Sequence, residues 1–124
     1  MNGKVLQGVL IDAAQKEIRR VEVRPDEKGS YLESVKALLE LGEFGLVDVM
    51  RDKLTWLPSS PADDIWVDDE MLDCPFAAAV HSEDLYIYGR GLILGWGPEG
   101  ECESTSLLDD DIDALVNAVS FYTV

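Results

Sequence analysis

Positive charge is almost missing from the second part of this sequence. Residues 1–53 carry 10 Asp and Glu against 9 Lys and Arg, whereas residues 54–124 carry 15 acids against a single base, Arg90. The formal net charge of the 124-residue chain is −15. A field of this sign repels nucleic acid and anionic lipid and attracts basic surfaces. We therefore expect a basic partner, and no direct binding of nucleic acid or membrane.

Cysteine, leader-like patterns and long apolar runs are also scarce. Two cysteines, Cys74 and Cys102, are too few for a disulfide framework, which favours a cytoplasmic protein with reduced thiols. The N-terminus lacks a basic and then apolar leader, so we expect no secretory signal. The longest apolar stretch, 85–96, is interrupted by Arg90 and is too short to cross a bilayer.

Catalytic and cofactor motifs are incomplete. The only histidine, His81, would need a nucleophile or an orienting carboxylate beside it in space, which its sequence neighbours do not establish. Zinc would need Cys74, His81, Cys102 and a fourth ligand, and the paired C-x-x-C spacing is absent. The glycines that begin at Gly89 do not follow the dinucleotide spacing, because Leu94 stands where that motif requires glycine. We expect no catalytic residues, no metal and no cofactor.

Hydrophobic residues, at 47% of the chain, are sufficient for a core, and the length fits one domain over 1–124. A strongly apolar run over 4–12 and the alternation of apolar and charged residues over 17–23 predict an N-terminal β-hairpin. The other predicted strands are 45–50, 53–57, 65–67, 76–80 (a strand or a helical turn) and 85–96, the last bent or divided at its glycines.

Two helices are predicted, over 31–41 and 107–119. Each follows a capping-box spacing, which is Ser30 with Glu33 in the first and Ser106 with Asp109 in the second. We expect Gly42 to supply the left-handed residue at the end of the first helix. The apolar stripe predicted for the second helix is Leu108, Ile112, Leu115, Val116 and Val119. Together these elements predict an α+β fold with a mostly antiparallel sheet.

Acidic residues cluster at two places in the second half of the chain. Carboxylates repeated along one surface can compete for a nucleic-acid groove in a basic protein, by the same counterion release that drives nucleic-acid binding. Alternatives are a solvated segment, a hard-cation site (although the spacing does not fit a calcium loop) and compensation of a helix dipole. The predicted partner-binding face consists of Asp63, Asp64, Asp68, Asp69, Glu70, Asp73, Asp109, Asp110, Asp111 and Asp113.

Arg90 and the tryptophans are secondary candidates. As the only base after Lys53, Arg90 is expected to pair with carboxylates or to sit where one positive charge is needed. The three tryptophans are far apart in the sequence, so we expect no stacking platform for bases. Trp56 and Trp66 are instead candidate core or interface anchors.

Two segments carry a resemblance to known proteins. Residues 66–72 (W-V-D-D-E-M-L) and 89–95 (G-R-G-L-I-L-G), with the earlier V-L-I-D of 9–12, resemble a domain-of-unknown-function family of short phage- and plasmid-encoded proteins. The resemblance covers most of 4–97. It implies a small protein of a mobile genetic element, similar in context to phage anti-defence inhibitors, and it implies no catalytic residues.

Charge and resemblance together predict a non-enzymatic inhibitor. It would bind a host CRISPR effector or restriction enzyme, in the cytoplasm of the host cell, and occlude its basic nucleic-acid site by charge mimicry. One alternative is a protein-interaction module that binds through an apolar patch around Trp56 and Trp66. Another is a small nucleotide-binding or nucleotide-sequestering protein, whose basic pocket would use the arginines of the first half, Arg19, Arg20, Arg24 and Arg51.

Overall fold

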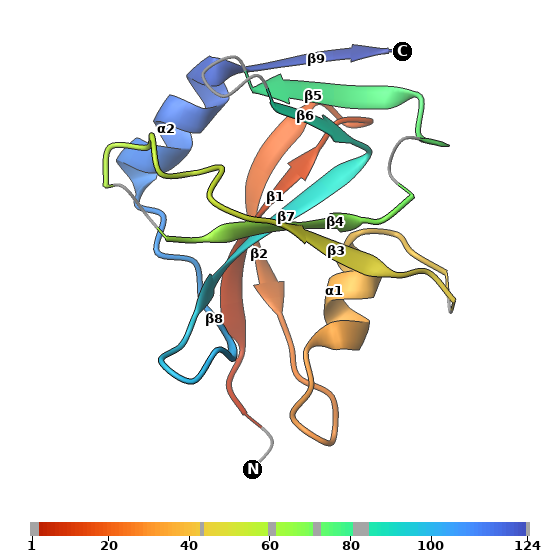
Figure 1. Cartoon of the computed structure of the whole chain (residues 1–124), viewed down its shortest axis with the longest axis vertical. Helices are drawn as coiled ribbons and strands as arrows, with labels where there is room; N and C mark the ends of the chain where they lie inside the picture. The colour runs from red at the N-terminus through yellow and green to blue at the C-terminus, as the bar shows by residue number, and fades with distance from the viewer. Residues whose placement is uncertain (1–2, 43, 60–61, 71–72, 81–84, 124) are drawn as a thin grey trace.

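The computed structural model describes residues 3–42, 44–59, 62–70, 73–80 and 85–123 (Figure 1). Strands dominate, and every pairing between them is antiparallel, so the predicted α+β class is confirmed. The elements in chain order are β1 (Leu6–Asp12), β2 (Glu17–Val23), α1 (Leu32–Leu38), β3 (Val47–Met50), β4 (Asp64–Asp68), β5 (Phe76–Val80), β6 (Leu85–Tyr88), β7 (Arg90–Trp96), β8 (Cys102–Glu103), α2 (Asp109–Ala118) and β9 (Val119–Thr123).

Two sheets form the body of the protein. The larger has the order β2-β1-β7-β4-β3, with β8 paired to β7, and the smaller has the order β6-β5-β9. The predicted hairpin is present as β1 and β2, with Asp12 opposite Glu17 at the turn. The predicted strand 85–96 is two strands in different sheets, which meet at Gly89 with its φ of 80°. Gly89 therefore connects the two sheets.

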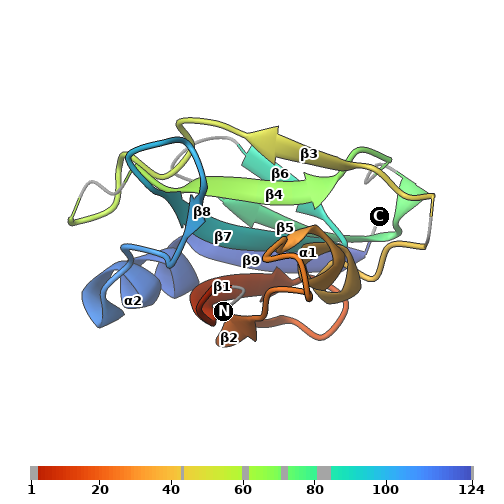
Figure 2. The same cartoon turned by 90° about the horizontal axis from the view of Figure 1, so that it is seen from below.

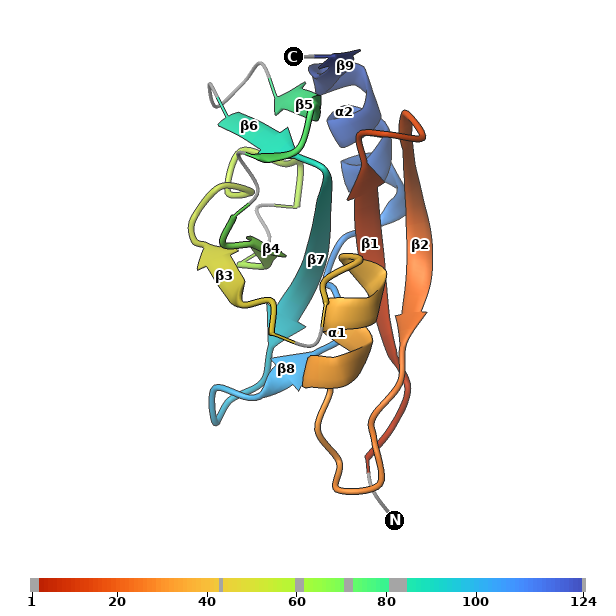
Figure 3. The ribbon, with the colours of Figure 1, turned by 90° about the vertical axis from the view of Figure 1, so that its right-hand side faces the viewer.

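Alternation along the central strands produces an apolar core on each face of the larger sheet. Val9, Ile65 and Ile93 face one core, which the smaller sheet and α2 close with residues such as Ile87 and Leu115. The intervening residues face a second core, in which α1 contributes Val35 and Leu39 beneath Leu10, Leu92 and Leu94. Figure 3 accordingly shows α1 and α2 on opposite sides of β1 and β7.

Both predicted helices are present but shorter than predicted. In α1, Leu39 is the C-cap and the left-handed residue is Glu40, with a φ of 59°, so the prediction for Gly42 was wrong. The turn closes at Glu40 because the N–H of Leu41 donates to the carbonyl of Lys36 at 2.9 Å. At ten residues, α2 is the longer of the described helices, and neither is long and apolar enough to cross a membrane.

The ends of α2 differ from the prediction. Asp111, not Asp109, completes the N-terminal turn, since it accepts the backbone N–H of Leu108 at 2.8 Å. Residues 119–123 form β9, an edge strand of the smaller sheet that was not predicted from the sequence. Leu108 and Val116 of the predicted stripe are exposed, whereas Leu115 is buried.

The predicted strand at 53–57 was also wrong. These residues form a turn, in which the N–H of Leu57 donates to the carbonyl of Leu54 at 3.2 Å. Both leucines are buried, at the i and i+3 positions that bring side chains together in a helical turn. The turn therefore buries both leucines, and their spacing does not require a strand.

Candidate functional site

Three of the ten acids assigned to a partner-binding face are buried. Asp63, Asp64 and Asp111 have exposures of 3%, 5% and 0%. A buried carboxylate is retained when hydrogen bonds compensate its desolvation, and each of these accepts several. Their assignment to an exposed face was therefore wrong, and their roles are structural.

Asp63 holds the segment that precedes α2 by hydrogen bonds. Its Oδ2 accepts the N–H of Ser106 at 2.9 Å and the hydroxyl of Thr105, and its Oδ1 accepts the hydroxyl of Ser106 at 2.6 Å. Three donors from residues more than forty positions away join the start of β4 to the chain leading into α2. Asp63 thereby fixes where α2 begins.

Asp64 contacts an aromatic cluster on the neighbouring strands β4 and β7 of the larger sheet. Its Oδ2 accepts the indole N–H of Trp96 at 2.6 Å and lies 3.4 Å from Nη1 of Arg51, whose guanidinium is 5.4 Å from the Trp96 ring centre. Trp66 lies 5.4 Å from Trp96, centroid to centroid. Two tryptophans that are far apart in the sequence are therefore neighbours, because β4 and β7 lie side by side in the sheet.

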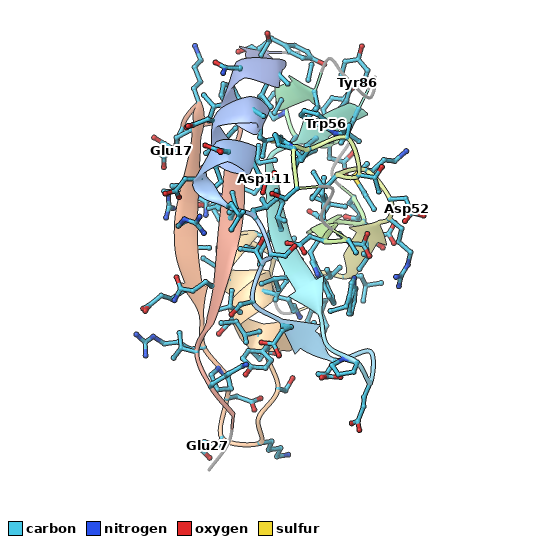
Figure 4. The ribbon with its side chains drawn as sticks, turned by 90° about the vertical axis from the view of Figure 1, so that its left-hand side faces the viewer. Glu17, Glu27, Asp52, Trp56, Tyr86 and Asp111 are labelled. Carbon is cyan, nitrogen blue, oxygen red and sulfur yellow. The ribbon has the colours of Figure 1, made fainter. Side chains whose placement is uncertain are left out.

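Asp111 joins α2 to the turn at 54–59. Its Oδ1 accepts the N–H of Ser59 at 2.9 Å, and Figure 4 shows Asp111 on the side of α2 that faces the body of the protein. Burial alone would raise the pKa of Asp111. Hydrogen bonds from the backbone N–H groups of Leu108 and Ser59 and from the Ser59 side chain outweigh that effect, so the pKa is lowered.

The other seven acids fall into two groups. One begins at the last residue of β4, Asp68, which is half-buried, and continues with the exposed Asp69, Glu70 and Asp73. The other lies on α2, where Asp109, Asp110 and Asp113 are exposed. The end of β4 and α2 lie on opposite sides of the molecule in Figures 1 and 2. The expectation of one continuous acidic face was therefore wrong.

The acids on α2 are already compensated in part. Asp109 lies 3.0 Å from Nη2 of Arg20 on β2, and the first turn of a helix favours negative charge. Compensation of the helix dipole was one of the alternatives that the sequence left open for this acidic cluster. The α2 group is thus the weaker candidate for contact with a basic partner.

The acids after β4 adjoin the most exposed apolar side chains of the described residues. Phe44 is 90% exposed and Leu46 is 65% exposed. The N–H of Asp69 donates to the carbonyl of Leu46 at 3.0 Å, which extends the β3–β4 pairing and joins the two segments. A hollow of about 440 Å³ lies between them, lined by Phe44, Leu46, Asp69 and Glu70. We call these four residues the β4-end surface.

Phe44 and Leu46 were not among the site residues predicted from the sequence. The sequence did contain an indication for Phe44, which lies between a glutamate and a glycine and outside every predicted element. An aromatic side chain in such a place is expected to be exposed, because no predicted helix or strand carries it into a core. Leu46 fell inside the predicted strand 45–50, whereas β3 begins at Val47. The strand prediction therefore concealed an exposed residue.

Arg90 pairs with carboxylates, as expected. It stands opposite Asp12 in the β1–β7 ladder, and its Nη2 lies 3.0 Å from Asp12 Oδ2 and 3.0 Å from Glu40 Oε1. Its Nη1 donates to the carbonyl of Leu38 at 2.8 Å. At Asp12 Oδ2 this contact is an ion pair, and the oxygen accepts no hydrogen bond from the described residues. These groups line a cavity of about 340 Å³, which we call the Arg90 cavity.

The two alternatives based on tryptophans and arginines are not supported by the placement of these residues. Trp56 packs against the core that α2 closes, and Trp66 packs against the core under α1, so they do not form one patch. Each arginine of the first half has a carboxylate partner: Arg19 pairs with Glu17, Arg20 with Asp109, Arg24 with Glu22 and Arg51 with Asp64. Because β2 and β3 are opposite edges of the larger sheet, these arginines do not converge on one pocket.

Cysteines and other titratable groups show no reactive site in the described part of the chain. Cys74 and Cys102 are free thiols, and burial raises the pKa of Cys102. No group of three or more His, Cys, Asp or Glu within the described ranges is placed to hold a metal ion. His81, the remaining candidate, lies outside those ranges.

The chain matches no protein-family model, and comparisons with curated proteins and with solved structures give no match.

Proposed function

We propose that the protein is a non-catalytic binding module that docks on a basic surface of a larger protein through the β4-end surface. The observation that carries this proposal is the junction of Phe44 with Asp69 and Glu70. An exposed aromatic group bordered by carboxylates provides an apolar anchor and an electrostatic rim.

Electrostatics support a basic partner. With a net charge of −15, the chain attracts cationic surfaces at long range, and the local carboxylates orient the encounter. The apolar anchor then supplies burial that persists after the charges have been screened by salt. Both contributions are present at the β4-end surface, whereas the α2 acids are partly neutralised by Arg20.

The more specific form of the proposal concerns the partner's identity. The residues that resemble proteins of mobile genetic elements favour a host complex that handles nucleic acid, such as a CRISPR effector or a restriction enzyme. Docking of an acidic protein on its Lys- and Arg-rich groove would exclude nucleic acid by competition. Because the acids are divided, the competing surface is the β4-end group alone rather than an extended phosphate-like array.

The test compares two variants with the same change in charge. The first replaces Asp69 and Glu70 by lysine, and its control replaces Asp110 and Asp113, which are exposed on α2, by lysine. Immobilised wild-type protein captures partners from a host lysate at about 50 mM and about 500 mM salt. Each captured protein is then purified, its affinity is measured by calorimetry, and its nucleic-acid binding is assayed with and without the wild-type chain.

We expect the Asp69→Lys, Glu70→Lys variant to weaken binding by at least about 100-fold, since close like charges at an interface cost several kcal/mol. The affinity of the control variant should remain within about tenfold of the wild-type affinity, because this variant loses only long-range attraction. Equal losses in both variants would contradict the assignment of the surface. A captured partner whose nucleic-acid binding is unaffected would contradict the inhibitory form of the proposal.

A further inference from the structure

The Arg90 cavity lies directly beside the β4-end surface. Asp68 lines the cavity, and the next residues in the chain, Asp69 and Glu70, line the hollow next to Phe44. The cavity is bounded by the β1–β2 turn, the end of α1, the start of β5 and the Gly89 junction. Its volume of about 340 Å³ is at the lower end of the range for ligand pockets.

Negative charge dominates the walls of the cavity. Three carboxylates, Asp12, Glu40 and Asp68, face one guanidinium, that of Arg90. Arg90 pairs with the buried Asp12 and with the exposed Glu40, so one positive charge stands against three negative charges and the cavity keeps an excess of negative charge. The buried Oδ2 of Asp12 lies 3.0 Å from Nη2 of Arg90, so Asp12 holds the guanidinium against the wall. These groups repel an anion and favour a cation that donates hydrogen bonds.

The geometry favours an organic cation over a metal ion. The described carboxylates and the thiol of Cys74 in the cavity are not arranged as a metal-binding group. The remaining walls include the apolar and aromatic side chains of Leu39, Phe76 and Tyr88. A flat, delocalised cation can contact such walls and donate hydrogen bonds to separate carboxylates, without the cluster of ligands that a metal ion requires.

We propose that the Arg90 cavity binds the guanidinium group of an arginine side chain that the basic partner presents. This inference depends on the proposed function, because it names the partner group that enters next to the β4-end surface. Glu40 exchanges part of its contact with Arg90 for the incoming guanidinium, and Asp68 provides the second carboxylate. The exchange is open to Glu40 because its side chain is 69% exposed.

The test uses a probe that carries only the proposed group. N-acetyl-arginine amide is titrated into the ¹⁵N-labelled full chain, and backbone amide shifts are recorded for the residues that line the cavity. N-acetyl-citrulline amide, which has nearly the same shape without the charge, is the control ligand. The variants are Glu40→Gln and Asp68→Asn, with Asp110→Asn as a control of equal charge change on α2. In Asp68→Asn an oxygen remains to accept the N–H of Glu70, as Asp68 Oδ1 does at 2.9 Å.

The arginine probe should shift the amides of Gln15, Gly89 and Arg90, and citrulline should bind at least about tenfold more weakly, because the charge-assisted hydrogen bonds are lost. Each cavity variant should weaken arginine binding by about three- to tenfold, and Asp110→Asn by less than about twofold. Shifts that are absent from the cavity, or equal for both probes, would overturn the inference. The capture experiment under the proposed function varies other residues, Asp69 and Glu70. If capture succeeds but the arginine titration fails, only the arginine site is overturned, and the proposed function stands.

Discussion

Arg90 and Asp12 face each other across the β1–β7 ladder, with 3.0 Å between Nη2 and Oδ2. Asp12 is almost fully buried, so the removal of Arg90 would leave a buried carboxylate without a counter-charge. We expect Arg90→Met to lower the free energy of unfolding by roughly 3 kcal/mol, measured by urea denaturation. The double variant Arg90→Met, Asp12→Asn should recover at least about 1 kcal/mol of that loss, because no buried charge remains. Additive losses would show that the two groups do not act as a pair.

The pKa of Asp111 makes its contribution to stability dependent on pH. The folded chain holds this pKa below its usual value, whereas the unfolded chain has a value of about 3.9. The stabilisation is therefore fully present above the unfolded-state pKa and is lost as the pH falls through the folded-state pKa. The difference in unfolding free energy between wild type and Asp111→Asn should be constant from about pH 7 to 5 and shrink below about pH 4.

At neutral pH the Asp111→Asn change should cost about 2 kcal/mol, since one amide oxygen cannot satisfy the two N–H donors of Ser59 and Leu108. Comparison with the variant removes the general effect of acid on a chain of net charge −15. Denaturation curves at a series of pH values measure the difference. A difference that does not change down to about pH 2.5 would contradict the lowered pKa.

Two acids of the same segment should respond differently to the same substitution. Asp63→Asn should lower the free energy of unfolding by about 2 kcal/mol, because the amide cannot accept from all three donors of Thr105 and Ser106. Asp73→Asn, at an exposed position, should remain within about 0.5 kcal/mol of wild type. Thermal unfolding of both variants measures the contrast, and equal stabilities would refute the division into structural and surface acids.

The exposed phenyl ring of Phe44 should affect binding without affecting stability. Phe44→Ser should leave the free energy of unfolding within about 0.5 kcal/mol, because a side chain that is 90% exposed contributes little burial. The same variant should weaken binding of the captured partner by at least about tenfold, as loss of an interface anchor does. Val116→Ser, at an exposed apolar residue of α2, is the control and should leave the affinity unchanged. A partner that binds both variants equally well would contradict the anchor role.

Local patterns were sufficient for much of the fold. An apolar run located β1, alternation located β2, and glycines marked the place where β6 ends and β7 begins. The sequence V-S-F-Y-T of β9 also has strand composition, but it follows α2 without glycine or proline, so the predicted helix extended into it. Leu54 and Leu57 fit a strand by composition and a turn by spacing, and the structure has the turn.

The candidate site was harder to predict, because exposure depends on contacts between distant residues. Asp63 and Asp68 are chemically identical and five positions apart, yet only Asp63 meets donors from Thr105 and Ser106. The sequence shows where the acids are, but it does not show which carboxylates accept hydrogen bonds from distant residues. The pairing of Arg90 was predictable because it is the only base after Lys53, whereas its partner Asp12 is known only from the register of β1 and β7.

A titration with nona-arginine measures most directly which surface of the protein binds a cationic partner. The peptide is added to the ¹⁵N-labelled chain at about 50 mM salt, and the backbone amides that shift are mapped onto the structure. We predict that the largest shifts occur at Phe44, Leu46 and Asp69, with smaller shifts on α2. Largest shifts at Asp109, Asp110 and Asp113 would contradict the assignment of the β4-end surface as the docking site.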